Sequence, residues 1–149
     1  MTDEYFMQQA LKEANKALEA GEVPIGAVIV MQDKIIARGY NQVETLNDST
    51  AHAEMITLTS AFNFLGAKYL PDAALYVTIE PCKMCCGALY WCKIGKLVYG
   101  SPDPKHGGLS LIMSSGNNAN TLHPKTKIVK DVLSNECIIL LKDFFKKRR

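Results

Sequence analysis

Residues 74–99 read ALYVTIEPCKMCCGALYWCKIGKLVY, and this stretch decides the fold. The apolar run Ala74–Thr78 is typical of a short strand. Pro81 then opens a helix over Cys82–Cys92, because proline is tolerated in the first turn of a helix. A glycine ends this helix, and Lys96–Tyr99 is again typical of a strand. A strand, a helix and a strand in this order predict two parallel strands joined by a crossover.

The rest of the chain alternates between helix and strand patterns. Apolar side chains recur with the helical period over Asp3–Ala20, and Gly21 supplies the stop signal. Two β-rich runs separated by a polar turn of hairpin length should pair antiparallel. The predicted elements outside residues 74–99 are this first helix, the strands Ile25–Met31 and Ile35–Tyr40 with the turn Gln32–Lys34, a helix over Ala51–Leu65 capped by Ser49 or Thr50, a short helix around Ser110–Ser114, a strand near Thr126–Val132, and a helix from Ser134 to the basic end. They predict an α/β fold with a mixed sheet of about five strands and helices on both faces.

Composition narrows the class of protein. The chain has 149 residues, of which 48% are hydrophobic and 21% charged, and its formal net charge is +2. These values are typical of one globular domain over residues 1–149 and exclude collagen and disorder. The longest apolar run, Ala27–Met31, is far below the roughly 18 residues of a membrane span, and the start of the chain lacks a basic leader. We therefore expect a cytoplasmic protein with no membrane partner.

The positive charge is concentrated at the end of the chain. Lys146, Lys147, Arg148 and Arg149 carry four positive charges, so the preceding 145 residues sum to −2. Such a tail attracts phosphate in nucleic acid or in an anionic membrane surface. It is equally compatible with a solvated helix end whose cations face the negative pole of the helix dipole.

The five cysteines indicate reduced, buried or metal-bound thiols rather than a disulfide framework, because their number is odd and no secretory leader is visible. Cys82, Cys85 and Cys86 cluster, whereas Cys92 and Cys137 lie apart.

One histidine and two of these cysteines have the chemistry of a zinc site. His52 precedes the Cys82–Cys85 pair, and three protein ligands with an open fourth position are typical of catalytic zinc, whereas structural sites use four. On a helix, Cys86 lies about 100° around from Cys85 and should therefore point into the core. The spacing thus predicts one zinc per chain, bound by His52, Cys82 and Cys85.

Glu54 completes this pattern as an acid beside the metal that is not needed as a ligand. His52 and Glu54 are two residues apart, so both approach one ion only if the ion lies off the N-terminal opening of their helix. Zinc supplies an activated water near neutral pH, and a free carboxylate is suited to move its proton to a ring nitrogen and a leaving amine. The order H-x-E, then P-C-x-x-C, is the signature of zinc nucleobase deaminases. Taken singly, the two motifs are also compatible with a redox pair or a structural zinc site.

The sequence resembles the cytidine and deoxycytidylate deaminase superfamily and, within it, the bacterial tRNA-specific adenosine deaminases. The segments that carry this resemblance are Gly21–Val28, Asn41, Thr50–Glu54, Leu75–Cys82, Cys85 with Gly87–Ala88, and Asp143–Phe145 before the basic residues. The resemblance implies a three-layer α/β/α homodimer that converts adenosine to inosine at the wobble position of the anticodon of an arginine tRNA.

The resemblance also implies substrate contacts. Asn41 would contact the flipped nucleotide, and the pocket wall would be formed by Pro24, Ile25, Gly26 and Ala27. The residues that would meet the anticodon loop are Asp103, Lys105, Phe144 and Phe145. Of the two phenylalanines, we expect Phe144 to belong to the core.

Two departures from the commoner family pattern, Ser101-Pro102 and His123-Pro124, lie at positions expected to contact RNA.

Two other stretches, Asn47–His52 and Leu65–Ala67, resemble guanine deaminases, so deamination of free guanine is the main alternative. A non-catalytic, zinc-stabilised RNA-binding module is a third hypothesis. Glu54 argues against it, because burying an unneeded carboxylate at a structural metal is costly.

Overall fold

The computed structural model describes residues 1–109 and 122–148. The elements are helix α1 (Asp3–Glu19), strands β1 (Gly26–Met31) and β2 (Lys34–Tyr40), helix α2 (Ala53–Leu65), strand β3 (Ala74–Ile79), helix α3 (Lys83–Trp91), strands β4 (Lys96–Ser101) and β5 (Lys127–Val129), and helix α5 (Ser134–Lys147). The short helix predicted around Ser110–Ser114 lies outside the described residues.

The five strands form one mixed sheet in the order β2-β1-β3-β4-β5. Strand β1 pairs antiparallel with β2 and with β3, while β3 pairs parallel with β4 and β4 with β5. The parallel pair β3 and β4, joined through α3, confirms the crossover predicted from residues 74–99. Strand β5 is shorter than predicted and pairs only through its three residues, Lys127–Val129.

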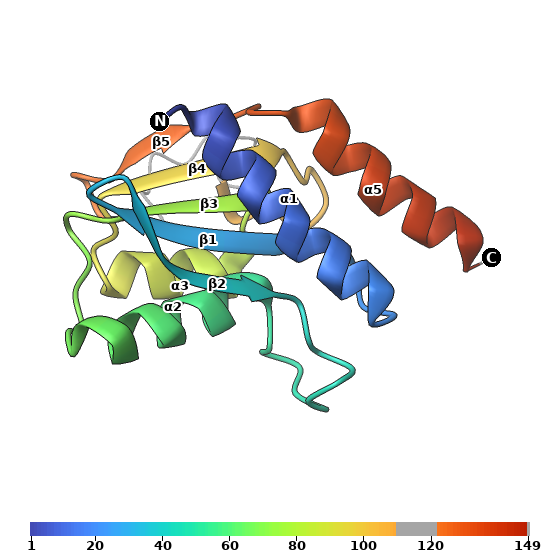
Figure 1. Cartoon of the computed structure of the whole chain (residues 1–149), viewed down its shortest axis with the longest axis horizontal. Coiled ribbons are helices and arrows are strands. Elements are labelled where there is room, and N and C mark those ends of the chain that lie inside the picture. The colour runs from blue at the N-terminus through green and yellow to red at the C-terminus, as the bar shows by residue number, and fades with distance from the viewer. Residues whose placement is uncertain (110–121, 149) are drawn as a thin grey trace.

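Helices cover both faces of this sheet. Helices α1 and α5 lie on one face, and α2 and α3 lie on the other (Figure 1). Side chains of β1 alternate between the two faces: Ala27 and Ile29 pack with α2 and α3, whereas Val28 and Val30 pack with α1 and α5. Because both faces are buried, β1 is a continuous apolar run. The predicted three-layer α/β/α arrangement is confirmed.

The turn between β1 and β2 is tighter than predicted. Gln32 and Asp33 alone form it, and both have left-handed backbones with φ of 52° and 61°. Two left-handed residues give the hairpin turn whose twist matches that of the paired strands. Lys34 consequently begins β2 and pairs with Met31 instead of belonging to the turn.

Helix α2 begins two residues later than predicted. Both the backbone N–H and the hydroxyl of Thr50 donate to Asp48 Oδ1 at 2.8 Å, so Thr50 closes the preceding turn and does not cap the helix. The N-cap of α2 is His52, and the N-cap of α3 is Cys82. Both helices therefore begin at residues that the sequence predicts as zinc ligands.

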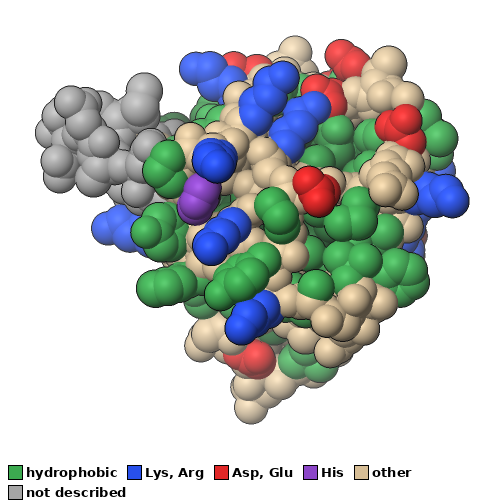
Figure 2. All heavy atoms as spheres, turned by 90° about the vertical axis from the view of Figure 1, so that its left-hand side faces the viewer, with side chains coloured by type: hydrophobic (Ala, Val, Ile, Leu, Met, Phe, Trp, Pro, Cys, Tyr) green, Lys and Arg blue, Asp and Glu red, His purple; other side chains and the backbone are tan. Residues whose placement is uncertain are grey.

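Positive charge is not confined to the C-terminal tail. Figure 2 shows the end of the molecule with the β1–β2 turn and the N-terminus, where Lys and Arg side chains gather around exposed hydrophobic ones. In the loops after α2 and α3, the Tyr69 ring lies 4.5 Å from Lys93 Nζ and 5.4 Å from Lys68 Nζ.

None of the helices in the described residues is long and apolar enough to cross a bilayer.

Candidate active site

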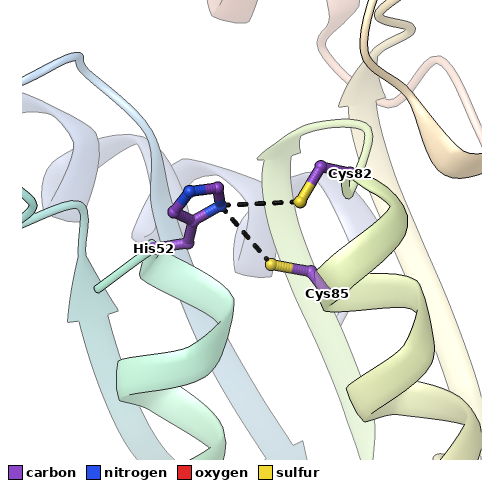
Figure 3. Close-up of side chains that lie close together, drawn as sticks. All are labelled: His52, Cys82 and Cys85. Carbon is purple, nitrogen blue, oxygen red and sulfur yellow. Dashed lines mark hydrogen bonds between the residues drawn. The ribbon is translucent and has the colours of Figure 1, made fainter. Parts of the chain in front are cut away.

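Three side chains that are far apart in the sequence converge where α2 and α3 begin. Figure 3 shows His52 at the start of α2 facing Cys82 and Cys85, which lie at the start and in the first turn of α3. His52 Nδ1 lies 3.6 Å from each sulfur atom. The ligand atoms of all three residues lie within 4.8 Å of one another. The structure thus brings together the three residues that spacing predicts as a ligand set.

The geometry of this cluster fits a tetrahedral zinc ion. With Zn–S bonds of about 2.3 Å and Zn–N bonds of about 2.0–2.1 Å, a tetrahedral ion separates a sulfur ligand from a nitrogen ligand by about 3.6 Å. Both His52–cysteine distances match this value. Three converging ligands also leave a fourth position free, as catalytic sites require. The donor set and these distances therefore fit a zinc ion.

The two cysteines have different protonation preferences. The Cys85 thiol and the His52 ring both donate to Cys82, and despite the opposing effect of burial they lower the pKa of Cys82 to about 3. The pKa of Cys85 is raised, because this thiol donates to Cys82 and is buried. Cys82 is thus a ready thiolate ligand, and a divalent cation would displace the proton of Cys85.

Cys86 points away from this cluster, as predicted. Its side chain is fully buried in the core between the sheet, α2 and α3, and its Sγ donates to the carbonyl of Pro81 at 3.5 Å. Cys92 and Cys137 are also buried and belong to the two hydrophobic clusters of the core.

Glu54 lies in the first turn of α2 beside the cluster, but it is not one of the three converging residues. Its side chain is 4% exposed and borders the pocket described below. Burial raises the pKa of Glu54 to about 7. A cation at the cluster would lower this value again, since a nearby positive charge favours the carboxylate. With a cation at the cluster, Glu54 would therefore be a carboxylate that can accept a proton.

A pocket of about 760 Å³ opens above the cluster, bordered by His52, Glu54 and Cys82. Its walls come from the loop after β2, the loop after β4, and α5. Five of the predicted substrate-binding positions line it, together with Phe144: Ile25, Asn41, Asp103, Lys105 and Phe145. Pro102, one of the two departures from the family pattern near β4, also lines the pocket.

Four residues were expected to form one wall of the pocket, namely Pro24, Ile25, Gly26 and Ala27. In the described structure Ile25 lines the pocket and the other three do not. Gly26 packs directly against the backbone of α1, where an added Cβ would meet Ala14 N. The Ala27 side chain points into the core beneath α2 and α3. Ile25 lies before the first residue of β1, whereas Gly26 and Ala27 belong to the strand and are covered by α1 and by the core.

Asn41 presents an unused polar atom at the pocket. The side chain is 7% exposed, and its Nδ2 donates to the carbonyl of Val23 at 3.3 Å. Its Oδ1 is buried and has no hydrogen-bond partner among the described residues. A buried acceptor without a partner is unfavourable unless a ligand supplies a donor.

The end of α5 contributes both core and surface to the pocket. Phe144 is 7% exposed, which confirms the expectation that it belongs to the core, whereas the Phe145 ring, packed edge-to-face against it at 5.3 Å, is 50% exposed. Lys146 and Lys147 are exposed at the end of this helix. Arg148 is not a purely solvated cation, because it donates to the carbonyl of Gly21 at 2.6 Å.

Several pocket residues were not among the sequence predictions. They lie before β1, in the loop after β2, at the start of α2, at the end of β3 and just after it, in the loop after β4 and on α5, and they are Gly21, Glu22, Val23, Val43, Glu44, Ala53, Ile79, Glu80, Pro104, His106, Ile138 and Leu141. For Glu22 a signal exists, since an acidic side chain stands next to an apolar run. For the α5 residues the helical period only indicates which face is buried, not that this face reaches the pocket.

Comparison with known proteins is consistent with this geometry. Residues 1–101 match the family described as the cytidine and deoxycytidylate deaminase zinc-binding region. The tRNA-specific adenosine deaminase of Bacillus subtilis (strain 168) is 45% identical over 147 residues, which cover 99% of this chain and 91% of that protein. The chloroplastic tRNA(adenine(34)) deaminase of Arabidopsis thaliana is 44% identical over 98% of this chain, which spans only 12% of that protein's length.

Solved structures show the same relationship. A structure from a study of A-to-I editing by tRNA:A34 deaminases at the wobble position of transfer RNA is 40% identical, with a TM-score of 0.82 over 92% of this chain and 99% of that chain. The guanine deaminase of Bacillus subtilis is 38% identical, with a TM-score of 0.66 over 79% of this chain and 73% of that chain. The zinc-compatible cluster, the fold and these similarities lead to one conclusion: the chain belongs to the cytidine and deoxycytidylate deaminase family.

Proposed function

We propose that this protein is a zinc-dependent tRNA adenosine deaminase, which converts adenosine to inosine by hydrolysis at the wobble position of the anticodon. The observation that carries this proposal is the three-residue cluster of His52, Cys82 and Cys85 with the buried Glu54 beside it, at the base of a pocket. The three ligands bind the metal and leave a position for water, while the fourth residue, the carboxylate of Glu54, is free to move protons.

The chemistry divides between the metal and Glu54. When bound, zinc polarises a water molecule so that it becomes a nucleophile near neutral pH. Glu54 takes one proton from the attacking water and delivers it to N1 of the purine ring, while the water oxygen bonds to C6. Glu54 then takes the remaining proton from that oxygen and passes it to the amino group at C6. The C6–N bond breaks, ammonia leaves, and a C6 carbonyl remains in inosine. A buried carboxylate beside the metal position, whose pKa burial raises and a bound cation would lower, is suited to both transfers.

Asn41 and Phe145 are the proposed substrate-binding residues at the mouth of the pocket. The unpartnered Oδ1 of Asn41 can accept a hydrogen bond from a nucleotide that has left its stack. Phe145 offers a half-exposed ring on which a loop base can stack. Ile25, Asp103 and Lys105 complete the contact surface on neighbouring walls. Single-stranded anticodon loops are recognised by this combination of stacking and edge contacts.

Two features favour RNA over free guanine. Curated tRNA-specific adenosine deaminases match nearly the whole chain, and the exposed Phe145 with Lys146 and Lys147 behind it extends the site beyond what a free base occupies. The non-catalytic RNA-binding alternative does not account for Glu54, which is buried at the metal cluster without serving as one of its ligands.

The finer assignments are part of the same proposal. The substrate is an arginine tRNA, the protein acts in the cytoplasm, and residues 1–149 form one deaminase domain.

The proposed dimer forms through α3: a second copy of the chain covers its outer face, where Tyr90 is 41% and Trp91 76% exposed and the two rings pack edge-to-face at 5.6 Å. Neighbouring exposed aromatic side chains are typical of interface cores.

One parallel assay separates the three hypotheses. The zinc-loaded protein is incubated with an arginine tRNA, with guanine and with cytidine, and ammonia and inosine are measured in each. We expect inosine only in the tRNA. Rapid guanine turnover without inosine would support the guanine deaminase alternative, and no turnover of any substrate would support the non-catalytic module.

A further inference from the structure

The end of α5 is fastened to the segment that joins α1 to β1, at one edge of the pocket. Arg148 Nη2 donates to the carbonyl of Gly21 at 2.6 Å, and its guanidinium carbon lies 4.5 Å from the centre of the Phe144 ring. The hydrogen bond links the last turn of the chain to a residue 127 positions earlier, whereas the contact with Phe144 lies within the end of α5. Together they hold the wall that carries Phe144 and Phe145 against the rest of the pocket.

Glu22, the residue after Gly21, holds a second wall of the pocket, the loop after β2, through hydrogen bonds. The Glu22 side chain is 1% exposed and accepts three hydrogen bonds. The donors are the backbone N–H of Glu44 at 3.1 Å, the backbone N–H of Thr45 at 2.6 Å and the Thr45 hydroxyl at 2.6 Å. Both donor residues belong to the exposed loop that follows Asn41.

Glu22 makes these bonds as an ionised group. Burial alone raises the pKa of Glu22, but the bonds from Thr45 and Glu44 and the positive charge of Arg148 outweigh it, so this pKa lies below its ordinary value. Hydrogen bonds to a carboxylate are stronger than those between neutral groups. The carboxylate therefore orders a loop segment that is otherwise exposed.

We propose that Glu22 and Arg148 are positioning residues that fix two walls of the pocket around the substrate nucleotide. Glu22 holds the loop beside Asn41, and Arg148 holds the end of α5 beside Phe145. Neither group touches the reacting atoms, so their effect is on binding. Without them the walls must be ordered when the substrate binds, and that ordering weakens affinity. The substrate part of this inference rests on the proposed function, whereas the two structural contacts do not.

Arg148→Ala and Lys147→Ala form a matched pair for the kinetic test. Each variant removes one exposed cation from the same helix end, but only Arg148 contacts Gly21 and Phe144. If both residues acted as phosphate contacts, both variants would raise KM equally, and the effect would fade at high salt. We expect Arg148→Ala to raise KM about tenfold more than Lys147→Ala, to retain that difference at high salt, and to change kcat less than about twofold.

Amide hydrogen exchange tests the Glu22 contact without any substrate. In Glu22→Gln the amides of Glu44 and Thr45 should exchange about tenfold faster than in the wild type, because the carboxylate no longer orders them. Glu19→Gln removes an equal charge at an exposed position nearby and should leave these amides unchanged. If Glu22→Gln does not fold, Thr45→Val, which removes one donor from an exposed residue, provides the same comparison, and Thr45→Ser should restore protection.

The outcomes are distinguishable. Equal KM values for the Arg148 and Lys147 variants, or unchanged exchange at Glu44 and Thr45, would overturn the positioning role. Faster exchange in a protein that forms no inosine would instead overturn the proposed function, and with it the assignment of these walls to a tRNA nucleotide.

Discussion

Glu54 and His52 are two residues apart in the chain, yet they have different chemical roles at the start of α2. His52 is the N-cap and directs its ring toward the two sulfur atoms, whereas Glu54 lies within the first turn beside the pocket. The open end of the helix allows both to approach one point, and its dipole favours negative charge there. This arrangement separates metal binding from proton transfer.

Replacing Glu54 should therefore abolish activity and spare the metal. We expect Glu54→Gln, which keeps the shape of the side chain but cannot carry a proton, to lose about 10²–10⁴-fold in kcat. Zinc content, measured by atomic emission, should stay at that of the wild type, and Glu54→Ala should behave likewise. A Glu54→Gln protein with near wild-type turnover would remove Glu54 from the mechanism.

The cysteines provide a second test, because Cys85 and Cys86 are neighbours whose side chains point in different directions. Cys85 belongs to the ligand cluster, while Cys86 is buried in the core and contacts the carbonyl of Pro81. We expect Cys86→Ala to purify with one zinc per chain and Cys85→Ala to purify with much less. Loss of zinc from Cys86→Ala alone would mean a different ligand set, with the metal in a closed structural site.

At the scale of single residues, the sequence predicts the zinc ligands well and the residues that form the pocket walls less well. Spacing predicted that His52, Cys82 and Cys85 meet, because each ligand stands at the start of a predicted helix and a metal fixes their mutual geometry. It did not predict the contact between Arg148 and Gly21, since no periodicity or motif relates residues so far apart. The family resemblance also implied a pocket wall of Pro24, Ile25, Gly26 and Ala27, of which only Ile25 lines the pocket in the described structure.

Among the helices and strands, α5 depends on an unusually close approach to β4. An added Cβ at Gly100 would meet the side chain of Cys137 on α5 and the carbonyl of Thr78 on β3. Gly100 thus permits the helix to lie against the sheet, and in this position its far end borders the pocket. The packing of one strand residue therefore affects the position of a pocket wall.

Gly100→Ala should separate α5 from the sheet. We expect a loss of about 1–3 kcal/mol in the free energy of unfolding, the usual range for overpacking in a core, as measured by urea denaturation. Gly87→Ala is the control: Gly87 lies within α3, and an added Cβ there meets nothing within 4 Å. The control should be neutral or more stable by up to about 1 kcal/mol, since alanine favours helix. Equal stability of the two variants would contradict the packing described for Gly100.

Whether a segment forms a helix or a strand was predictable from the sequence, whereas the first and last residues of these elements were less predictable. The helical period of Asp3–Glu19 and the apolar run of β1 are strong local signals, and both elements formed where predicted. The start of α2 moved because a side chain-to-backbone turn between Asp48 and Thr50 competes with helix capping, and sequence alone does not decide that competition. Strand β5 has three residues and ends at Val129, where its pairing with β4 ends.

For the molecule as a whole, the functional groups gather at one end of the sheet. The starts of α2 and α3, the end of α5 and the loops after β2 and β4 all border the same pocket. The opposite end carries the lysines around Tyr69 and is distant from the cluster in the fold (Figures 1 and 2). The fold thus assigns catalysis and the proposed RNA contacts to a single end of the protein.

The most direct test of this account is the source of oxygen in the product. Zinc-loaded protein is incubated with the anticodon stem-loop of an arginine tRNA in water enriched in oxygen-18, and the RNA is digested and analysed by mass spectrometry. Hydrolytic deamination predicts inosine at the wobble position alone, with one heavy oxygen from solvent, and an equal amount of ammonia. An unmodified stem-loop, under conditions in which the same protein deaminates free guanine, would contradict it.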